Sequence, residues 1–87
     1  MDISDQERTD ITNRLKRARG QIDGVLGMIE EGRSCRDVVT QLGAASTAVE
    51  RAALKIVAVG LKQCYLEGGD VDSMSAEEME ALLLSIA

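Results

Sequence analysis

The fold of this chain is decided by the stretch from Ser34 to Tyr65, SCRDVVTQLGAASTAVERAALKIVAVGLKQCY, which carries a cysteine near each end. The stretch has no proline, and its centre is rich in alanine, which lets helices approach closely. We therefore predict one long helix, in which Cys35 and Cys64 are 29 residues apart. At about 1.5 Å and about 100° per residue, they lie about 43 Å apart along the axis and only about 20° apart around it. Both cysteines point to the same side, but they cannot meet within one helix.

Two copies of this helix packed antiparallel would bring the cysteines together. The two-fold axis would cross the helix near Val49, so that Cys35 of one copy would lie beside Cys64 of the other. We therefore expect the chain to function as an oligomer built on this pairing.

Two further helices are predicted on either side of the long one. Residues before it carry apolar side chains at alternating intervals of four and three, namely Ile11, Leu15, Ala18, Ile22, Val25 and Ile29. Ser4 is the expected N-cap of this first helix, and Gly32 is its expected left-handed end. Gly68 and Gly69 are expected to break the long helix, and a short last helix follows Ser75.

The predicted fold class is all-α with three helices, two long and one short at the C-terminus. Since neither long helix can bury its apolar face alone, we expect an antiparallel dimeric four-helix bundle.

Composition limits the possible classes of function. A length of 87 residues fits one domain, residues 1–87, near the size at which oligomerisation helps stability. The chain has no histidine, so the usual general base and the commonest ligand of zinc and nickel are absent. We expect no enzymatic activity. No leader and no membrane span are evident, and two cysteines without a leader indicate the reducing cytoplasm.

The charge is distributed unevenly along the chain. The net charge is −5, yet Arg8–Arg19 holds five bases and one acid, whereas residues 66–87 hold six acids and no base. A basic patch of this kind can bind DNA phosphates, although charged helix faces are more often only solvated. No helix-turn-helix accompanies it. The basic residues that we single out are Arg14, Lys16, Arg17, Arg19 and Arg51.

The two cysteines are predicted to differ in chemistry. Cys35 lies in the first helical turn with Arg33 and Arg36 on either side, and the positive helix end favours its thiolate. The alternative, a small buried apolar residue, fits this position poorly. Cys64 lies in the last turn and would be structural if it acted alone. As the partner of Cys35 from another chain, it would be a resolving thiol or a second soft metal ligand.

The segment Arg14–Cys64 closely resembles the copper-sensing operon repressor (CsoR) family. The resemblance rests on the motif R-L-x-R-x-x-G-Q at Arg14–Gln21, on both cysteines and on the run through Glu50–Arg51. It implies an antiparallel dimer that assembles into a disc-like tetramer without a helix-turn-helix. It also implies that basic residues of the first two helices bind double-stranded operator DNA. Arg14 and Arg51 are the positions most associated with DNA contact, and Lys16, Arg17 and Arg19 are their neighbours.

One departure from the copper-sensing pattern points to a branch of the family. Copper sensors have a histidine four residues before the second cysteine, and this chain has Gly60 there. Nickel and cobalt sensors need several histidines, and formaldehyde sensors need an N-terminal proline. The remaining resemblance is to the persulfide-sensing CsoR-like sulfurtransferase repressors. It implies that a sulfane sulfur donor reacts with Cys35, that Cys64 of another protomer then forms a cross-link, and that DNA is released. No cofactor and no resident metal are expected.

Three alternatives remain open at this point. The chain could be a Cu(I)-sensing repressor that uses only Cys35 and Cys64 as ligands. It could instead be a small thiol carrier that does not bind DNA. The third alternative is a helical interaction module in which the cysteines are incidental.

Overall fold

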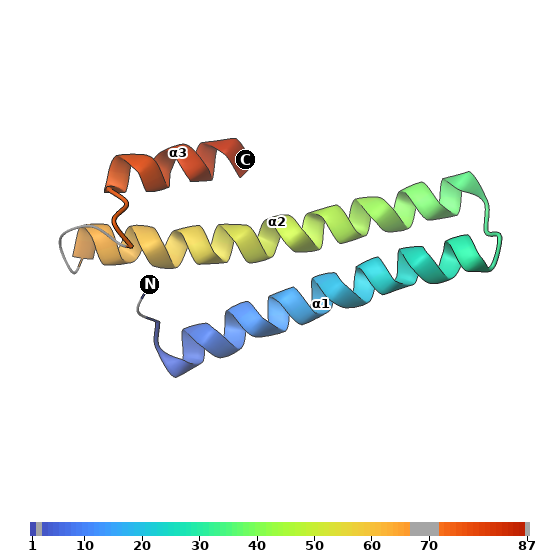
Figure 1. The fold of residues 1–87 in the computed structure, drawn as a ribbon, viewed down its shortest axis with the longest axis horizontal. Helices are drawn as coiled ribbons and strands as arrows, with labels where there is room; N and C mark the ends of the chain where they lie inside the picture. Colours follow the sequence, from blue (N-terminus) through green and yellow to red (C-terminus); the bar gives the residue numbers. More distant parts are fainter. Residues whose placement is uncertain (2, 67–71, 87) are drawn as a thin grey trace.

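The chain folds into three helices, as shown by a computed structural model that describes residues 1, 3–66 and 72–86. Helix α1 spans Asp5–Glu30, α2 spans Cys35–Leu66 and α3 spans Ala76–Ile86. Helices α1 and α2 form an antiparallel hairpin, and α3 folds back along the other side of the C-terminal half of α2 (Figure 1). The all-α prediction is confirmed for the described residues. The predicted break at Gly68 and Gly69 lies outside them.

The ends of α1 are fixed by local signals that the sequence carries. The Glu7 backbone N–H donates to Ser4 Oγ at 3.1 Å, and the Ser4 N–H donates to Glu7 Oε1 at 3.0 Å, so the capping box is complete. Gly32 has a φ of 70°, and the Arg33 N–H bonds the Met28 carbonyl at 2.9 Å across it. This left-handed cap turns the chain sharply, and α2 therefore begins directly alongside α1.

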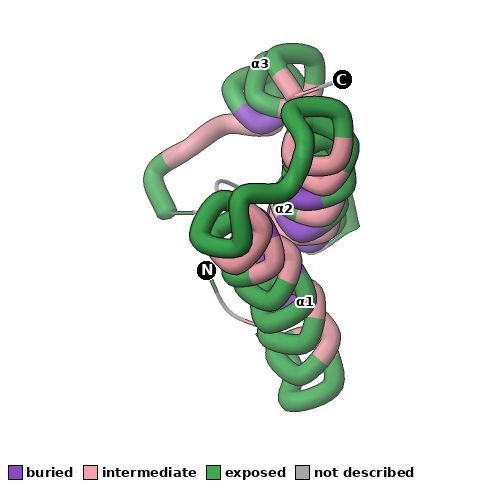
Figure 2. The backbone as a smooth tube through the Cα atoms, turned by 90° about the vertical axis from the view of Figure 1, so that its right-hand side faces the viewer, coloured by how far each residue is buried: buried purple, intermediate pink, exposed green. Residues whose placement is uncertain are grey.

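The predicted apolar face of α1 is divided between two surroundings. Ile11, Ala18 and Val25 are buried, as are the α2 residues Ala45, Ala52 and Val59. Figure 2 shows buried segments on both α1 and α2, and the two helices pack against each other along the hairpin. The remaining α1 positions are largely exposed: Leu15 at 48%, Ile22 at 45% and Ile29 at 59%.

Helix α2 shows the same division. Leu42 and Val49 are 53% and 46% exposed, and they lie on the side of α2 that carries Cys35. Large apolar side chains that recur on an exposed surface are typical of interaction sites. We call the exposed positions Leu15, Ile22, Ile29, Leu42 and Val49 the apolar stripe.

A polar contact fixes how α1 and α2 sit against each other. The Gln41 side-chain amide of α2 donates to the Gln21 side chain of α1. A Cβ atom at Gly24 would lie 3.2 Å from Gln41 Nε2, so glycine leaves room for this amide. The pair sets the register that aligns the basic residues of the two helices. None of the described helices has an apolar stretch long enough to cross a bilayer.

Candidate DNA-binding groove and sensor thiols

Basic side chains from α1 and α2 meet at a hollow of about 280 Å³ on one side of the hairpin. Its lining residues are Arg14, Arg17, Gln21, Ala44, Thr47, Ala48 and Arg51. The alanine side chains between the arginines are small, so guanidinium groups from both helices border one depression. A second hollow of about 260 Å³ is lined by Arg14, Arg51, Leu54 and Lys55. Because Arg14 and Arg51 line both hollows, we treat the two as one cationic groove.

An aspartate sits at the edge of the cationic groove. Asp10 Oδ1 accepts a hydrogen bond from Arg14 Nε at 3.1 Å, and its Oδ2 lies 3.3 Å from Lys55 Nζ. The hydrogen bond from Arg14, and after it the bond from Lys55, lowers the pKa of Asp10 below its ordinary value. The carboxylate is therefore ionised at neutral pH, and it links one cation of α1 to one cation of α2.

A second acidic residue makes a similar link outside the groove. Lys62 Nζ donates to Glu7 Oε2 at 3.4 Å, joining the start of α1 to the end of α2. Hydrogen bonds from Ser4, first from its backbone N–H and then from its hydroxyl, lower the pKa of Glu7. This pair lines another hollow, which includes neither Arg14 nor Arg51 but adjoins the groove through Asp10 and Lys55.

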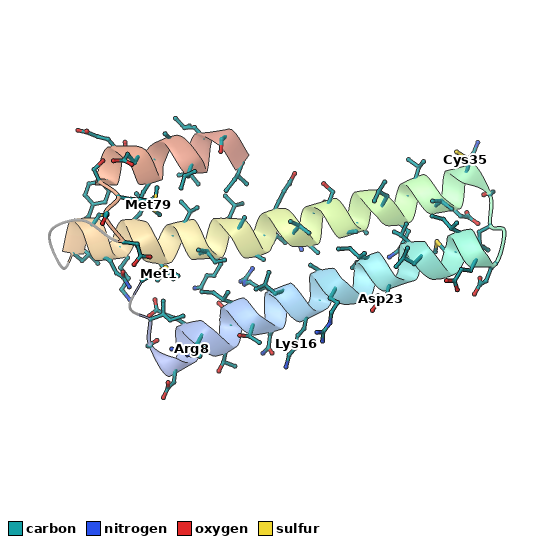
Figure 3. The ribbon with its side chains drawn as sticks, viewed as in Figure 1. Met1, Arg8, Lys16, Asp23, Cys35 and Met79 are labelled. Atoms are coloured by element: carbon teal, nitrogen blue, oxygen red, sulfur yellow. The ribbon has the colours of Figure 1, made fainter. Side chains whose placement is uncertain are left out.

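Only some of the basic residues singled out from the sequence line the groove. Arg14, Arg17 and Arg51 line it. Lys16 and Arg19 do not, and Lys16 points away from α2 (Figure 3). Sequence reasoning missed Lys55, which follows Arg51 by one helical turn and therefore lies on the same face of α2.

Sequence reasoning also missed the roles of Asp10 and Gln21. Asp10 precedes Arg14 by one turn, and Gln21 follows it by two turns, so both lie on the face of α1 that borders the groove. The spacing of four residues between Asp10 and Arg14 could have indicated their ion pair, and Gln21 is the last residue of the R-L-x-R-x-x-G-Q motif.

Cys35 is exposed in the first turn of α2. The Ser34 hydroxyl caps this helix by accepting the Asp37 backbone N–H at 3.2 Å. Arg33 is not available to Cys35 as a simple positive charge, because its Nη2 lies 3.0 Å from Asp37 Oδ2 and its Nη1 lies 3.8 Å from Glu31 Oε2.

Cys64 is in the opposite environment, at the other end of the same helix. Only 8% of it is exposed, and it forms a buried cluster with Val57 and Met79. Met79 belongs to α3 and lies between that helix and α2 (Figure 3). The rest of the cover consists of partly buried residues, Leu61, Met74, Ala76, Leu83 and Ile86. Helix α3 thus covers the second thiol.

A hydrogen bond at the surface also ties α3 to α2. The Tyr65 hydroxyl donates to Glu80 Oε1. This bond is the main reason that the pKa of Tyr65 is raised above its ordinary value of 10.0. The tie lies next to Cys64 in sequence and holds α3 over it.

Among the residues that the structure describes, the two thiols of one chain do not come together. Cys35 and Cys64 lie at opposite ends of α2, and the buried Gly60 offers no side-chain donor. Within residues 1, 3–66 and 72–86, no group of three or more histidine, cysteine, aspartate or glutamate side chains is placed to hold a metal ion. Any soft metal held by these thiols would have to be shared between chains.

Comparisons with known proteins define the family. Residues 7–85 match the family described as metal-sensitive transcriptional repressor. The chain is 32% identical over 80 residues to the copper-sensing transcriptional repressor CsoR of Bacillus subtilis, covering 88% of this chain and 79% of that protein. It is 35% identical over 82 residues to the copper-sensing transcriptional repressor RicR of Mycobacterium tuberculosis, covering 88% and 85% respectively. No solved structure matches the chain.

A further relative is shorter. The uncharacterized protein YrkD of Bacillus subtilis is 39% identical over 62 residues, covering 67% of this chain and 98% of that protein. The family match includes both cysteines and all but the ends of the three helices, and the relatives with a named function are repressors rather than enzymes. The chain therefore belongs to the CsoR family of metal-sensitive transcriptional repressors.

Proposed function

We propose that this repressor binds operator DNA through the cationic groove and releases it when a reactive sulfur species joins Cys35 of one copy to Cys64 of another. The observation that carries the proposal is the arrangement of α2. The helix is unbroken from Cys35 to Leu66, and the exposed Leu42 and Val49 lie between its two thiols.

A second copy laid antiparallel on the apolar stripe would cover it. Burial of exposed leucine, isoleucine and valine side chains is favourable by roughly 1.5–3 kcal/mol for each one fully buried. Val49 lies midway between the cysteines, so a two-fold axis there would place Cys35 of each copy near Cys64 of the other. Two hairpins paired in this way form the expected four-helix bundle. The family resemblance extends this dimer to a tetramer.

The groove supplies the chemistry for binding DNA. Guanidinium groups bind phosphate through paired, charge-assisted hydrogen bonds, and Arg14, Arg17 and Arg51 border one depression. Symmetry would repeat this depression on the second copy. Such contacts position a protein on the duplex, and base contacts then add sequence preference.

The proposed sensing reaction is thiol exchange. The Cys35 thiolate attacks the terminal sulfur of a persulfide RSSH, the S–S bond breaks, RS⁻ leaves, and Cys35 becomes a persulfide. The thiolate of Cys64 in the second copy then attacks Cys35 Sγ and expels HS⁻, which leaves a disulfide. If a polysulfide has placed two extra sulfurs on Cys35, attack on the inner one expels HS⁻ and leaves a trisulfide. No outside oxidant is needed, because the sulfane sulfur is reduced as the thiols are oxidised.

The two thiol environments support this order of events. Cys35 is exposed and meets the donor first, whereas Cys64 lies under α3 and acts second. A difference of a few kcal/mol between the cross-linked and reduced shapes would be enough to change DNA occupancy substantially.

Copper sensing through the same two thiols is the competing function. The relatives CsoR and RicR are named as copper-sensing repressors. Two thiolates from different copies can hold Cu(I) in linear coordination, but Gly60 supplies no third ligand. The lack of a third donor favours sulfur chemistry over copper in this chain.

One experiment separates the two functions. Duplexes are selected from a random pool by the reduced protein, and their binding is measured after treatment with polysulfide or with Cu(I) buffered by a strong chelator. We expect polysulfide to produce a dimer-mass species with zero or more added sulfurs and to abolish DNA binding. Release by buffered Cu(I), with no effect of polysulfide, would instead assign the chain to copper.

A further inference from the structure

We propose that Asp10 is a resident counter-ion of the cationic groove, which occupies Arg14 and Lys55 when DNA is absent and limits how tightly phosphate binds. The inference rests on the proposed DNA-binding function. It identifies one residue that weakens that binding and one cation, Lys55, that adds to it.

The geometry of Asp10 resembles that of a bound anion. Its two oxygens engage Arg14 Nε at 3.1 Å and Lys55 Nζ at 3.3 Å, one cation from each helix. Both cations line the groove together with Arg51. A DNA phosphate that entered this hollow would offer oxygens to the same two side chains. Phosphate binding there must therefore displace Asp10 or accept its negative charge as a neighbour.

Both consequences weaken binding. The carboxylate side chain is 39% exposed, so its repulsion of a nearby phosphate is reduced by solvent but not removed. In the Asp10→Asn variant, Arg14 and Lys55 would attract mobile salt anions, and DNA would release these on binding. We therefore expect an affinity about three- to tenfold higher and a salt dependence steeper by about one unit of slope per groove.

The chain provides a matched control for the acid. Glu7 lies on the same helix, carries the same charge and pairs with Lys62 at 3.4 Å, in a hollow that includes neither Arg14 nor Arg51 and adjoins the groove at Asp10 and Lys55. Glutamine at this position can still complete a capping box with Ser4. Glu7→Gln therefore changes net charge by the same amount as Asp10→Asn while leaving the groove intact. Lys62→Gln is the corresponding control for Lys55→Gln.

The experiment compares wild type with these variants on a fluorescent mixed-sequence duplex over a series of NaCl concentrations. Circular dichroism verifies that each variant retains its helix content. We expect Asp10→Asn to bind more tightly with a steeper salt slope, Lys55→Gln to bind several-fold more weakly, and the Glu7 and Lys62 variants to stay within about twofold of wild type.

Two results would overturn the inference. One is an Asp10→Asn protein that is folded but binds no more tightly than wild type. The other is an equal increase in DNA affinity in the Glu7→Gln variant, which would mean that the effect comes from net charge alone. The proposed function fails separately, if wild type shows no salt-dependent binding and Arg51→Ala changes nothing.

Discussion

The two ends of α2 carry the same residue type on the same side of the helix, yet their surroundings are opposite. At the N-terminal end, Cys35 is exposed beside a short polar turn. At the C-terminal end, Cys64 is buried under α3, in contact with Met79. In the proposed reaction, α3 rather than the residue type would therefore determine which thiol reacts first.

This comparison also bears on the cross-link. Antiparallel pairing would bring the exposed thiol of one copy to the covered thiol of the other. Helix α3 must then shift before a bond to Cys64 can form. The second step would therefore require local opening of α3, and the same cover would limit random oxidation of Cys64.

The largest expected effect comes from removing the pairing that brings the two ends together. Val49→Asp places a charge at the centre of the apolar stripe, where burial would be costly. We expect loss of the dimer in light scattering and loss of all polysulfide cross-linking. Thr40→Asp adds the same charge at an exposed position of α2 outside the stripe, and it should retain both. An undiminished cross-link in Val49→Asp would contradict the antiparallel pairing.

The second prediction measures the two ends directly. Under native conditions, a maleimide should modify Cys35 at least about tenfold faster than Cys64, because Cys64 reacts only when α3 opens locally. Mass spectrometry of time points, with denatured protein as the reference for equal access, gives both rates. Equal native rates would mean that α3 does not protect the thiol.

The third prediction concerns the side chain that covers Cys64. Met79→Ala should lower the free energy of unfolding by roughly 2–5 kcal/mol, because it leaves a cavity in the buried cluster. Thermal unfolding monitored by circular dichroism tests this. Modification of Cys64 should speed up while that of Cys35 stays unchanged. A parallel increase at Cys35 would indicate global rather than local opening.

The smallest effect is expected at the surface tie. Tyr65→Phe removes the hydroxyl that donates to Glu80, and should accelerate Cys64 modification about two- to threefold. This bond raises the pKa of Tyr65 above 10.0, so the hydroxyl stays protonated and can donate below pH 10, and the bond is lost as the pH rises through the raised pKa. Labelling should therefore be carried out near neutral pH, where the bond is present. Glu80→Gln offers a second route, since it keeps an acceptor and should have less effect.

The helix boundaries were predictable because their causes are local. Ser4 caps α1 and Gly32 ends it with a positive φ, as the sequence indicated, and Ser34 caps α2 by an equally local contact. The apolar pattern predicted for the first helix also contains the three residues that α1 buries, Ile11, Ala18 and Val25. The pattern could not show which of its residues are buried against the other helix of the same chain and which are left exposed, because periodicity alone treats them alike.

The site was predictable only in part, for the same reason. Arg14, Arg17 and Arg51 were among the basic residues singled out, and the structure brings these three to one groove, whereas Lys16, singled out with them, points away from α2. That these residues bind DNA stays a prediction. The link from Asp10 to Lys55 depends on the register between α1 and α2, which no local pattern contains. The cover over Cys64 likewise depends on where α3 packs, and the sequence alone offered only its apolar face.

The central claim is that Cys35 of one copy reacts with Cys64 of another. It is tested most directly by producing Cys35→Ala and Cys64→Ala chains together, with distinguishable tags, and treating the mixture with polysulfide. We predict that neither variant alone forms a cross-linked dimer and that the mixture forms one carrying both tags. A cross-link in either variant alone, or none in the mixture while wild type cross-links fully, would contradict the account.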